Sequence, residues 1–383
     1  MTGNLPLVVV CSGTSWDGVP LPDRMLTVEL LRHARILWVD PPVSAATRTK
    51  HRHGARRGVL PVVTRPVPGL IRLTPAALPL HTRRGVRVST RALVRLQIRW
   101  ALRRLAERPF AVLDCRLARL LGGWGSGVRN VLYGTDDYVA GAKLMGLDAA
   151  AVEADERVTV AAADLVLAVS QPLADRWRRM GATVEFLPNG VAAEAYLDVD
   201  SAVPAADVDL PGPVVGLIGH LSDRIDIDLL EAVASAGLSL LLVGPWDQRW
   251  QPERFPRLVA RPGVRWVGLR PFDQLPGYYR HMDVGITPYL DTEFNRASFP
   301  LKTLEYLAAG RAAVSTDLPA TRWLETDLIR VARGPDDFVA AVREAAGETR
   351  TRDLVAARQA VAGRHSWRER ADEAAKLLGL TDG

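Results

Sequence analysis

The chain has 383 residues, of which 48% are hydrophobic and 24% are charged. This length suits two globular domains, and the composition excludes a disordered chain. No run of about 18 apolar residues is present, so no transmembrane helix is expected, and the first residues lack the basic stretch of a signal peptide. The two cysteines, Cys11 and Cys115, fall in predicted strands, which is typical of reduced core residues in a cytoplasmic protein.

Positive charge is concentrated in the first half of the chain. Residues 1–190 contain 27 Lys and Arg against 15 Asp and Glu, a net charge of +12, whereas residues 191–383 have a net charge of −6. This asymmetry predicts an anionic partner, such as a lipid headgroup, a lipid diphosphate or an acidic glycan. Residues 48–108 are the candidate contact with an anionic membrane surface. No nucleic-acid partner is expected, because no nucleic-acid-binding motif accompanies the charge.

Apolar strands alternate with helical patterns along the whole chain, which predicts an α/β fold with parallel sheets. In the first half, strands are expected at 7–11, 36–39, 111–115, 130–133 and 165–169. Helices are expected at 22–33, 88–107, 149–163 and 171–180, the last beginning after Ser170 as N-cap. Residues 44–66 are expected to form a basic loop.

Proline and glycine punctuate residues 188–212, and no Lys or Arg occurs from Gly181 to Asp223. This composition predicts a linker at 188–212 between a first domain at 1–187 and a second at 213–365. The second domain is expected to place strands at 214–218, 238–243, 264–267, 284–287 and 312–315. A capping-box pattern at 366–369 begins a last helix, residues 366–383. Two doubly wound, Rossmann-like domains are expected to bind ligands at the carboxyl ends of their strands, facing a cleft.

One stretch of the second domain is the most informative: DVGITPYLDTEFNRASFPLKTLEYLAAG, residues 283–310. It predicts a buried strand, a polar loop and a helix that opens at Ser298 and ends before Gly310. The N-terminus of a helix attracts anions, and Lys302 adds a full positive charge there. Glu305 lies one turn further and could accept hydrogen bonds from vicinal hydroxyls. These residues predict a site for a nucleotide diphosphate, with an ordinary surface Lys–Glu pair as the alternative.

This stretch resembles the donor-binding motif of GT-B glycosyltransferases, and the resemblance continues in LPNGVAAEAY at 187–196, GLIGHLSDRIDIDLL at 216–230 and VRWVGLRPFDQLPGYY at 264–279. Within that superfamily, SFPLKTLEYLAAGR is most similar to enzymes that build teichuronic-acid-type and other surface polysaccharides. The resemblance implies a GT-B fold, in which the C-terminal helix packs back on the first domain. Typical retaining members carry two glutamates eight positions apart. Glu305 matches the second, and Ala297 stands at the first, so inversion and retention both remain open.

The resemblance also assigns donor residues near the start of the second domain. Gly219 follows a predicted strand and lets the backbone approach a ligand closely, and Arg224 is expected to neutralise the donor diphosphate. Arg270 lies in the loop that the resemblance places around the nucleobase. His220 is a catalytic candidate that could hydrogen-bond the donor or the acceptor, with a structural role as the alternative.

Asp136 and Asp137 directly follow a predicted strand of the first domain. Either is a candidate general base for the acceptor hydroxyl, and an N-cap or Asx-turn is the alternative role.

The loop after the first strand contains Ser12, Gly13, Trp16 and Asp17, and the resemblance places this loop on the acceptor side. Trp16 would offer a stacking face, and Asp17 is an alternative base.

The helix predicted at 88–107 has one apolar stripe, formed by Val94, Ile98, Ala101, Leu102 and Leu105. The opposite side carries Arg95, Arg99 and Arg103 with Leu96 and Trp100. This pattern fits an interfacial membrane helix, but a solvated arginine face is the favoured interpretation.

The sequence therefore predicts a metal-independent glycosyltransferase that uses a nucleotide-diphosphate sugar, with UDP-sugar favoured, as co-substrate and has no tightly bound cofactor. The acceptor would be a saccharide, a lipid-linked intermediate, an aglycone or a carrier-bound substrate in polysaccharide or secondary-metabolite biosynthesis. A cytoplasmic location, or a peripheral one at the inner face of the plasma membrane, is expected. A catalytically inactive nucleotide-sugar binder and a GT-B-type epimerase are the alternatives.

Overall fold

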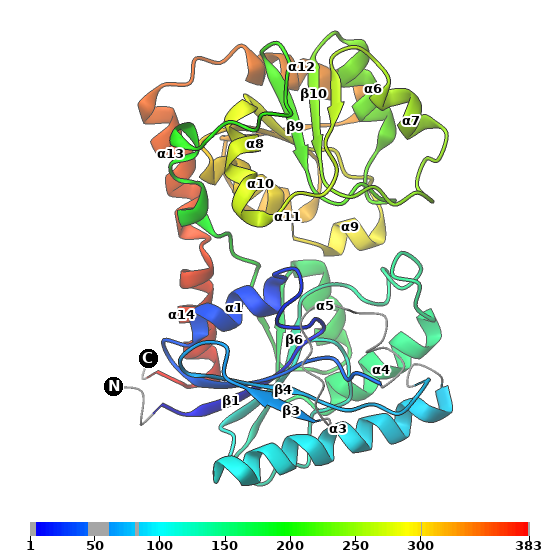
Figure 1. Cartoon of the computed structure of the whole chain (residues 1–383), viewed down its shortest axis with the longest axis vertical. Coiled ribbons are helices and arrows are strands. Elements are labelled where there is room, and N and C mark those ends of the chain that lie inside the picture. Colours follow the sequence, from blue (N-terminus) through cyan, green and yellow to red (C-terminus); the bar gives the residue numbers. More distant parts are fainter. Residues whose placement is uncertain (1–4, 45–60, 81–83, 300, 382–383) are drawn as a thin grey trace. The chain divides into compact units, whose positions relative to one another are not determined.

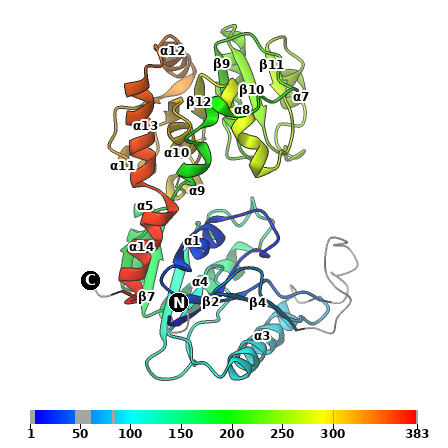
Figure 2. The same cartoon turned by 60° about the vertical axis from the view of Figure 1, so that its left-hand side comes forward.

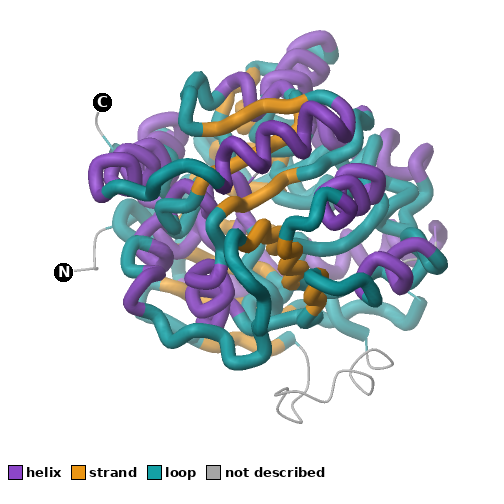
Figure 3. Tube along the Cα trace, turned by 90° about the horizontal axis from the view of Figure 1, so that it is seen from above, coloured by secondary structure: helices purple, strands orange, loops and turns teal. Residues whose placement is uncertain are grey.

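The structure is a computed structural model that describes residues 5–44, 61–80, 84–299 and 301–381 (Figure 1). The chain divides into two compact units: Met1–Pro188 together with Trp367–Gly383, and Asn189–Ser366. Figure 3 traces the alternation of strands, in orange, and helices, in purple. Most of the predicted basic loop lies outside the described residues.

Within the described residues, the first unit contains an eight-stranded sheet with the order β3-β4-β2-β1-β5-β6-β7-β8. The strands are β1 (Leu7–Cys11), β2 (Arg35–Val39), β3 (Val62–Thr64), β4 (Leu70–Thr74), β5 (Ala111–Asp114), β6 (Arg129–Gly134), β7 (Leu165–Ala168) and β8 (Val184–Phe186). The helices are α1 (Pro22–Leu30), α3 (Arg84–Leu105), α4 (Ala149–Ala161), α5 (Gln171–Arg179) and α14 (Trp367–Leu378).

Within the described residues, the second unit contains a six-stranded parallel sheet with the order β11-β10-β9-β12-β13-β14. The strands are β9 (Val214–Ile218), β10 (Ser239–Val243), β11 (Val264–Trp266), β12 (Val284–Thr287), β13 (Ala312–Thr316) and β14 (Ile329–Ala332). The α-helices are α6 (Ile227–Ser235), α7 (Arg254–Val259), α8 (Leu275–His281), α9 (Glu293–Ala297), α10 (Leu301–Ala308), α11 (Pro319–Trp323), α12 (Gly334–Ala346) and α13 (Arg352–Arg364). Short 3₁₀ helices are η1 (Ala193–Tyr196), η2 (Val199–Ser201) and η3 (Phe272–Gln274).

The central strands are buried along their whole length. β1 reads LVVVC and β9 reads VVGLI, and every residue of both strands is buried. A strand in the middle of a parallel sheet is covered on both faces, so it needs a continuous apolar run instead of an alternating one. This is why these strands are recognisable in the sequence.

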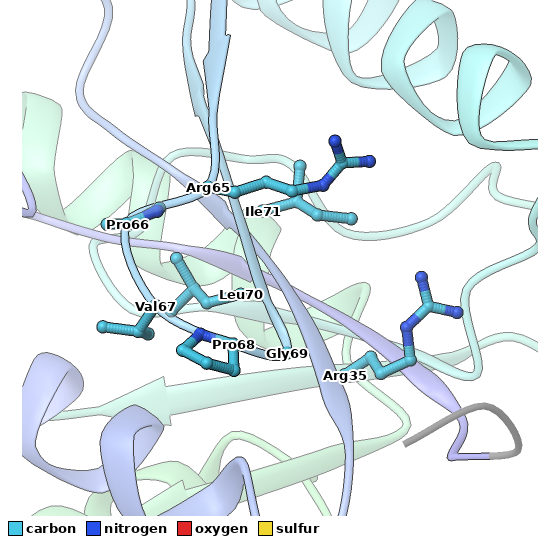
Figure 4. A pocket seen from close by; sticks show the side chains of 8 residues that line it. All are labelled: Arg35, Arg65, Pro66, Val67, Pro68, Gly69, Leu70 and Ile71. Carbon is cyan, nitrogen blue, oxygen red and sulfur yellow. The ribbon is translucent and has the colours of Figure 1, made fainter. Parts of the chain in front are cut away.

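The edge strands are not recognisable in the sequence. Residues 44–66 are a predicted loop, yet β3 lies at Val62–Thr64 and pairs antiparallel with β4. Two of the three residues of β3 are exposed, so β3 has no apolar run that would predict it. The turn between β3 and β4 borders a hollow of about 360 Å³ (Figure 4), with Arg65 in the turn and Arg35 on β2. This hollow lies at the amino ends of β2 and β4, away from the edge where α/β sheets bind ligands.

The predicted linker packs as part of the second unit. Tyr196 is 1% exposed and Val199 is 2% exposed, and both lie in the same apolar core as Leu304 of α10. Asp200 accepts a hydrogen bond from the buried Arg311 at 2.6 Å. Proline-rich composition indicates irregular backbone, but it does not reveal whether that backbone is packed.

The C-terminal helix α14 belongs to the first unit and packs on α1. The red α14 lies beside the blue α1 in Figure 1. Asp372 forms an ion pair with Arg32 at 2.9 Å and lies 2.5 Å from His33. Figure 2 shows the preceding helix, α13, beside α10 of the second unit.

Helix α3 begins before the predicted residue 88, and its apolar stripe is buried from Val94 to Leu102. The arginine face is not simply solvated. Arg95 donates to the backbone oxygens of Leu121 and Gly122, and Arg95 and Arg99 both lie over the ring of Trp124. These arginines therefore stabilise a neighbouring loop.

Candidate functional site

The sheet of the second unit reverses its direction of growth between β9 and β12. The chain adds β10 and β11 on one side of β9, and β12, β13 and β14 on the other. Open α/β sheets bind ligands at such a switch point, beyond the carboxyl ends of the strands. Two loops meet there, residues 219–226 and 288–292. Ile225 bridges to Tyr289, and the N–H of Asp226 donates to the oxygen of Pro288 at 2.8 Å.

Helix α10 is held over the same point by Tyr306. The Tyr306 hydroxyl accepts from the N–H of Ile218, at the end of β9, and donates to the oxygen of Ile286 on β12. The ring lies directly on Gly285, where a Cβ atom would be 2.1 Å from the Tyr306 ring. A glycine in β12 therefore allows α10 to approach the sheet closely.

Lys302 and Glu305 lie together on α10. The Lys302 ammonium donates to Glu305 Oε2 at 2.7 Å, and the hydroxyl of Tyr279 donates to the same oxygen at 2.5 Å. The Glu305 side chain is 12% exposed. Burial, followed by the charge and hydrogen bonding of Glu305, raises the pKa of the buried Tyr196 phenol above its ordinary value, so the Glu305 carboxylate lies close to this hydroxyl as well. Burial, followed by the charge of Glu305, raises the pKa of Tyr279 well above its ordinary value, so this phenol stays protonated as a donor. One carboxylate oxygen of Glu305 is thus fixed by Lys302 and Tyr279.

Arg224 is held from three sides. Its Nε donates to Asn295 Oδ1 at 2.9 Å, and its guanidinium lies 5.2 Å from the ring of Tyr289 and 4.9 Å from that of Phe294. Asn295 in turn donates to the backbone oxygens of Arg224 and Leu290. The two terminal nitrogens of Arg224 have no acceptor within the described part of the chain. The guanidinium is therefore fixed in position while two of its nitrogens can bind an anion.

Ser298 and Arg270, which the sequence also predicts to contact the sugar donor, make hydrogen bonds within the second unit. Ser298 is the C-cap of α9, and its hydroxyl donates to the oxygen of Phe294. Arg270 donates to Asp207 at 2.7 Å and to Tyr278 at 2.6 Å, so its charge is already engaged. Arg270 is thus held by contacts within the second unit.

Gly219 and His220 follow β9 directly. A Cβ atom at Gly219 would meet nothing within 4 Å, whereas one at Gly244 would lie 1.8 Å from the oxygen of Gly219. His220 is exposed. It contributes, after the hydrogen bonds and charge of Arg249, to lowering the pKa of Asp247 to about 2. Gly219 leaves open space beside the switch-point loop.

The two adjacent aspartates of the first unit have different environments. Asp137 is 2% exposed, and its Oδ1 accepts from the N–H groups of Val139 and Ala140. Its Oδ2 accepts from Arg176 at 2.6 Å. Both oxygens of Asp137 are thus used as a turn cap and an ion pair, which is the alternative role that the sequence left open. Asp136 is half-buried, and its Oδ1 accepts from the N–H of Asp137.

The loop after β1 is built around buried carboxylates. Ser12 is buried and donates to Asp23 Oδ2 at 2.6 Å, and the N–H of exposed Gly13 donates to the same oxygen. Trp16 is 6% exposed and packs edge-on against Trp38, with Arg24 over its ring. The predicted stacking face of Trp16 is therefore already covered, because the indole fills the core.

Asp17 is 77% exposed and forms an ion pair with Arg72 at 2.7 Å. Arg72 also pairs with Asp40, which is buried and accepts from Trp38 and Thr74. Asp40 and Asp23 organise the carboxyl ends of β1 and β2. The N–H of Trp16 also donates to Asp40. The sequence shows Asp40 at a strand end, but only the tertiary structure shows these four partners.

Within the described ranges, no three His, Cys, Asp or Glu side chains gather in a way that could hold a metal ion. No helix in the same ranges is both long and apolar enough to cross a membrane.

Known proteins resemble this chain in sequence and in fold. Residues 212–348 match the family model described as glycosyl transferases group 1. A Bacillus subtilis protein named as a teichuronic acid biosynthesis glycosyltransferase, TuaH, is 30% identical over 191 residues. These residues are 48% of this chain and 48% of TuaH, so the match spans about half the length of this curated relative.

Solved structures resemble nearly the whole chain. Sucrose-phosphate synthase from Thermosynechococcus elongatus has a TM-score of 0.74 at 16% identity, covering 97% of this chain and 98% of that one. Anabaena HepE, solved in complex with UDP and glucose, has a TM-score of 0.68 at 15% identity, covering 98% and 100%. The predicted resemblance to GT-B glycosyltransferases is confirmed, and so is the α/β fold with two Rossmann-like domains.

Proposed function

From the premise that residues 212–348 match the group 1 glycosyltransferases, we propose that this protein transfers a sugar from a UDP-sugar to a hydroxyl or amine acceptor in polysaccharide or secondary-metabolite biosynthesis. The observation that carries the proposal concerns the switch point of the second unit. Arg224 lies in a loop there, and Lys302 and Glu305 lie on α10, which Tyr306 joins to β9 and β12. The UDP complex of HepE and the naming of TuaH support this choice of donor and pathway.

The second unit is the donor side of this proposal. The free nitrogens of Arg224 and the ammonium of Lys302 bind the diphosphate and stabilise the charge that develops on it as the sugar leaves. The carboxylate of Glu305 accepts hydrogen bonds from the ribose hydroxyls. Gly219 leaves room for the diphosphate beside the backbone of its loop. This electrostatic catalysis is supplied by the side chains of the chain itself.

The first unit is the acceptor side. Asp136 takes the proton from the acceptor hydroxyl, whose oxygen attacks the anomeric carbon while the bond from that carbon to the diphosphate breaks and UDP leaves. Asp136 is preferred over Asp137, because Asp137 is buried whereas Asp136 is partly exposed. This assignment favours inversion, in agreement with the absence of a carboxylate at Ala297.

We further propose a cytoplasmic location with peripheral contact to an anionic membrane through α3. Trp100 is 40% exposed and Leu96 is 59% exposed, and the neighbouring Arg103 and Arg104 are exposed as well. The test is flotation with vesicles that contain anionic lipid. Failure of the protein to float at low salt contradicts the membrane contact without affecting the proposed activity.

A thermal-shift panel with UDP, TDP and GDP tests the donor, followed by release of UDP from UDP-glucose in the presence of candidate acceptors. We expect UDP to stabilise the protein most. No response to any of the three diphosphates contradicts the proposal. Stabilisation by UDP without sugar transfer to any acceptor indicates the inactive binder, and interconversion of the UDP-sugar itself indicates the epimerase.

A further inference from the structure

The first unit contains a cavity of about 300 Å³ that the proposed donor site does not include. It is lined by the loops that follow β2, β5 and β6, and by helices α3 and α4. The cavity therefore lies beside the carboxyl ends of these strands, the edge at which parallel sheets bind ligands. Its volume is at the lower end of the range for small-molecule sites.

Positive charge gathers at this cavity. Arg87 and Arg91 line it and pair with Asp155 at 3.0 and 2.6 Å, and Arg119 pairs with the same carboxylate at 2.6 Å. Asp155 is thus shared by three guanidinium groups. Arg116 also lines the cavity and has no ion-pair partner among the described residues. One carboxylate cannot neutralise these arginines, so the cavity attracts an anion.

Two polar atoms in the wall have no partner. Thr90 is 4% exposed and lines the cavity, and its hydroxyl oxygen is buried without a hydrogen bond inside the described ranges. The Nε of Arg116 is buried and unpartnered in the same way. Buried polar groups that lack partners are costly and uncommon. Rotation of these two side chains toward the cavity would bring both donors to the oxygens of a bound anion.

The rest of the wall is apolar, and it is formed by Val94, Leu117, Leu120, Leu147 and Val152. Asp114 at the end of β5 shapes this part, because its carboxylate accepts from the N–H groups of Arg116, Ala118 and Leu120. Leu147 is 47% exposed, so the apolar side reaches the surface. A ligand that fits has an anionic head and an apolar body.

We propose that this cavity binds a phosphate ester with an apolar chain. Guanidinium groups present paired N–H donors to phosphate oxygens, and the apolar wall takes the chain. This assignment rests on the proposed function. It places the acceptor in the class of phosphorylated amphiphiles, with its phosphate bound by Arg116, Arg91 and Thr90. A membrane lipid headgroup and a soluble phosphate ester share this chemistry.

Calorimetric titration with geranyl monophosphate, geraniol and inorganic phosphate tests the cavity. We expect geranyl monophosphate to bind at least tenfold more tightly than either of the others. R116Q should weaken it about tenfold or more. T90V should weaken it several-fold without lowering the melting temperature, because the substitution removes an unpartnered hydroxyl. R157Q, on an exposed arginine of α4, is the matched control and should bind as the unchanged protein does.

Equal binding of inorganic phosphate, equal binding of geraniol, or binding unaffected by both R116Q and T90V overturns the proposal. A binding assay with vesicles that carry a long-chain polyprenyl phosphate distinguishes a membrane lipid headgroup from a soluble phosphate ester. If the protein binds these vesicles and geranyl monophosphate displaces it, the ligand of the cavity is a lipid headgroup. If the protein binds geranyl monophosphate but not the vesicles, the ligand is a soluble phosphate ester. A parallel UDP titration keeps the two proposals apart. If the protein binds UDP but not geranyl monophosphate, only the proposal about the cavity is overturned. If it binds geranyl monophosphate but not UDP, only the proposal about the donor site is overturned.

Discussion

Arg224 illustrates how single residues prepare the candidate donor site. Its guanidinium lies over Tyr289 and Phe294, and its Nε is held by Asn295. An arginine that is already fixed loses little side-chain freedom when an anion binds, so more of the interaction energy is available for binding. Lys302 is fixed in the same sense by its contact with Glu305.

Replacing Lys302 with Ala should weaken UDP binding by about tenfold or more, since a hydrogen bond to a charged group contributes about 1.5–3 kcal/mol. Titration calorimetry measures the change. K376A is the matched control, because Lys376 is an exposed lysine of α14 in the first unit. Equal UDP affinity of K302A and K376A would remove Lys302 from the site.

The aspartates at 136 and 137 should separate in their effects. D136N should lower the transfer rate by a factor of about 10²–10⁴, the range for a general base, with unchanged UDP affinity. D137N should lower the melting temperature, because Arg176 and two backbone N–H groups lose their charged acceptor. Rate assays and thermal melts of both variants provide the comparison. A D136N enzyme that retains full activity excludes Asp136 as the base.

The substitution Gly219→Ala should affect UDP binding without affecting the stability of the fold. Nothing lies within 4 Å of the added Cβ atom, so the melting temperature should not fall. If a diphosphate rests beside this backbone, the methyl group should weaken UDP binding about tenfold, or about 1.4 kcal/mol. Melting curves and UDP titrations of G219A measure both quantities. Unchanged UDP affinity would place the diphosphate elsewhere.

At the scale of elements, the position of α10 depends on contacts from both neighbouring strands and from the segment before β9. Tyr306 connects α10 to β9 and β12. Arg311, just before β13, connects η2 to α8 through Asp200 and the oxygen of Tyr279. The segment 189–212 is therefore part of the scaffold that positions α8 and α10, although its composition predicts a linker.

Asp200→Asn should destabilise the second unit by about 1 kcal/mol or less at neutral pH, because buried Arg311 loses its charged acceptor but solvent screens the 57% exposed Asp200 side chain. Burial raises the pKa of Asp200, but the hydrogen bond and charge of Arg311 outweigh burial and hold the pKa below its ordinary value of 3.8. The carboxylate therefore stabilises the fold above about pH 4, and this contribution disappears as pH falls through the lowered pKa. Denaturant unfolding of both proteins at pH 7 and pH 3 measures the difference. A difference that is equally large at pH 3 contradicts this mechanism.

At the scale of the whole molecule, each unit has its own sheet and its own core, and the chain passes between the units at 188–189 and at 366–367. Calorimetry should therefore resolve two unfolding transitions. UDP at a hundred times its dissociation constant should stabilise the second unit by about 2.7 kcal/mol. We expect one transition to move and the other to remain in place. A UDP-induced shift of the first unit alone would contradict the donor assignment.

The sequence by itself determined the fold class, most central strands and the group of residues around Lys302. Buried parallel strands must be continuous apolar runs. Helix α10 places Lys302 and Glu305 about one turn apart, which the spacing of the two residues already indicates. Ser170 as an N-cap is likewise a local interaction, and its hydroxyl accepts from the N–H of Leu173. Such signals arise within a few residues and can be read directly.

Only the tertiary structure decided which polar atoms are free to bind a ligand. Asp137 is occupied by an arginine 39 residues later, and Arg224 is fixed by an asparagine 71 residues later. Arg270 is likewise engaged by Asp207 and Tyr278, and the cavity wall at Thr90 joins helices and loops that are distant in the chain. Hydrogen-bond partners of this kind are set by how strands and helices pack, so neither composition nor spacing can reveal them.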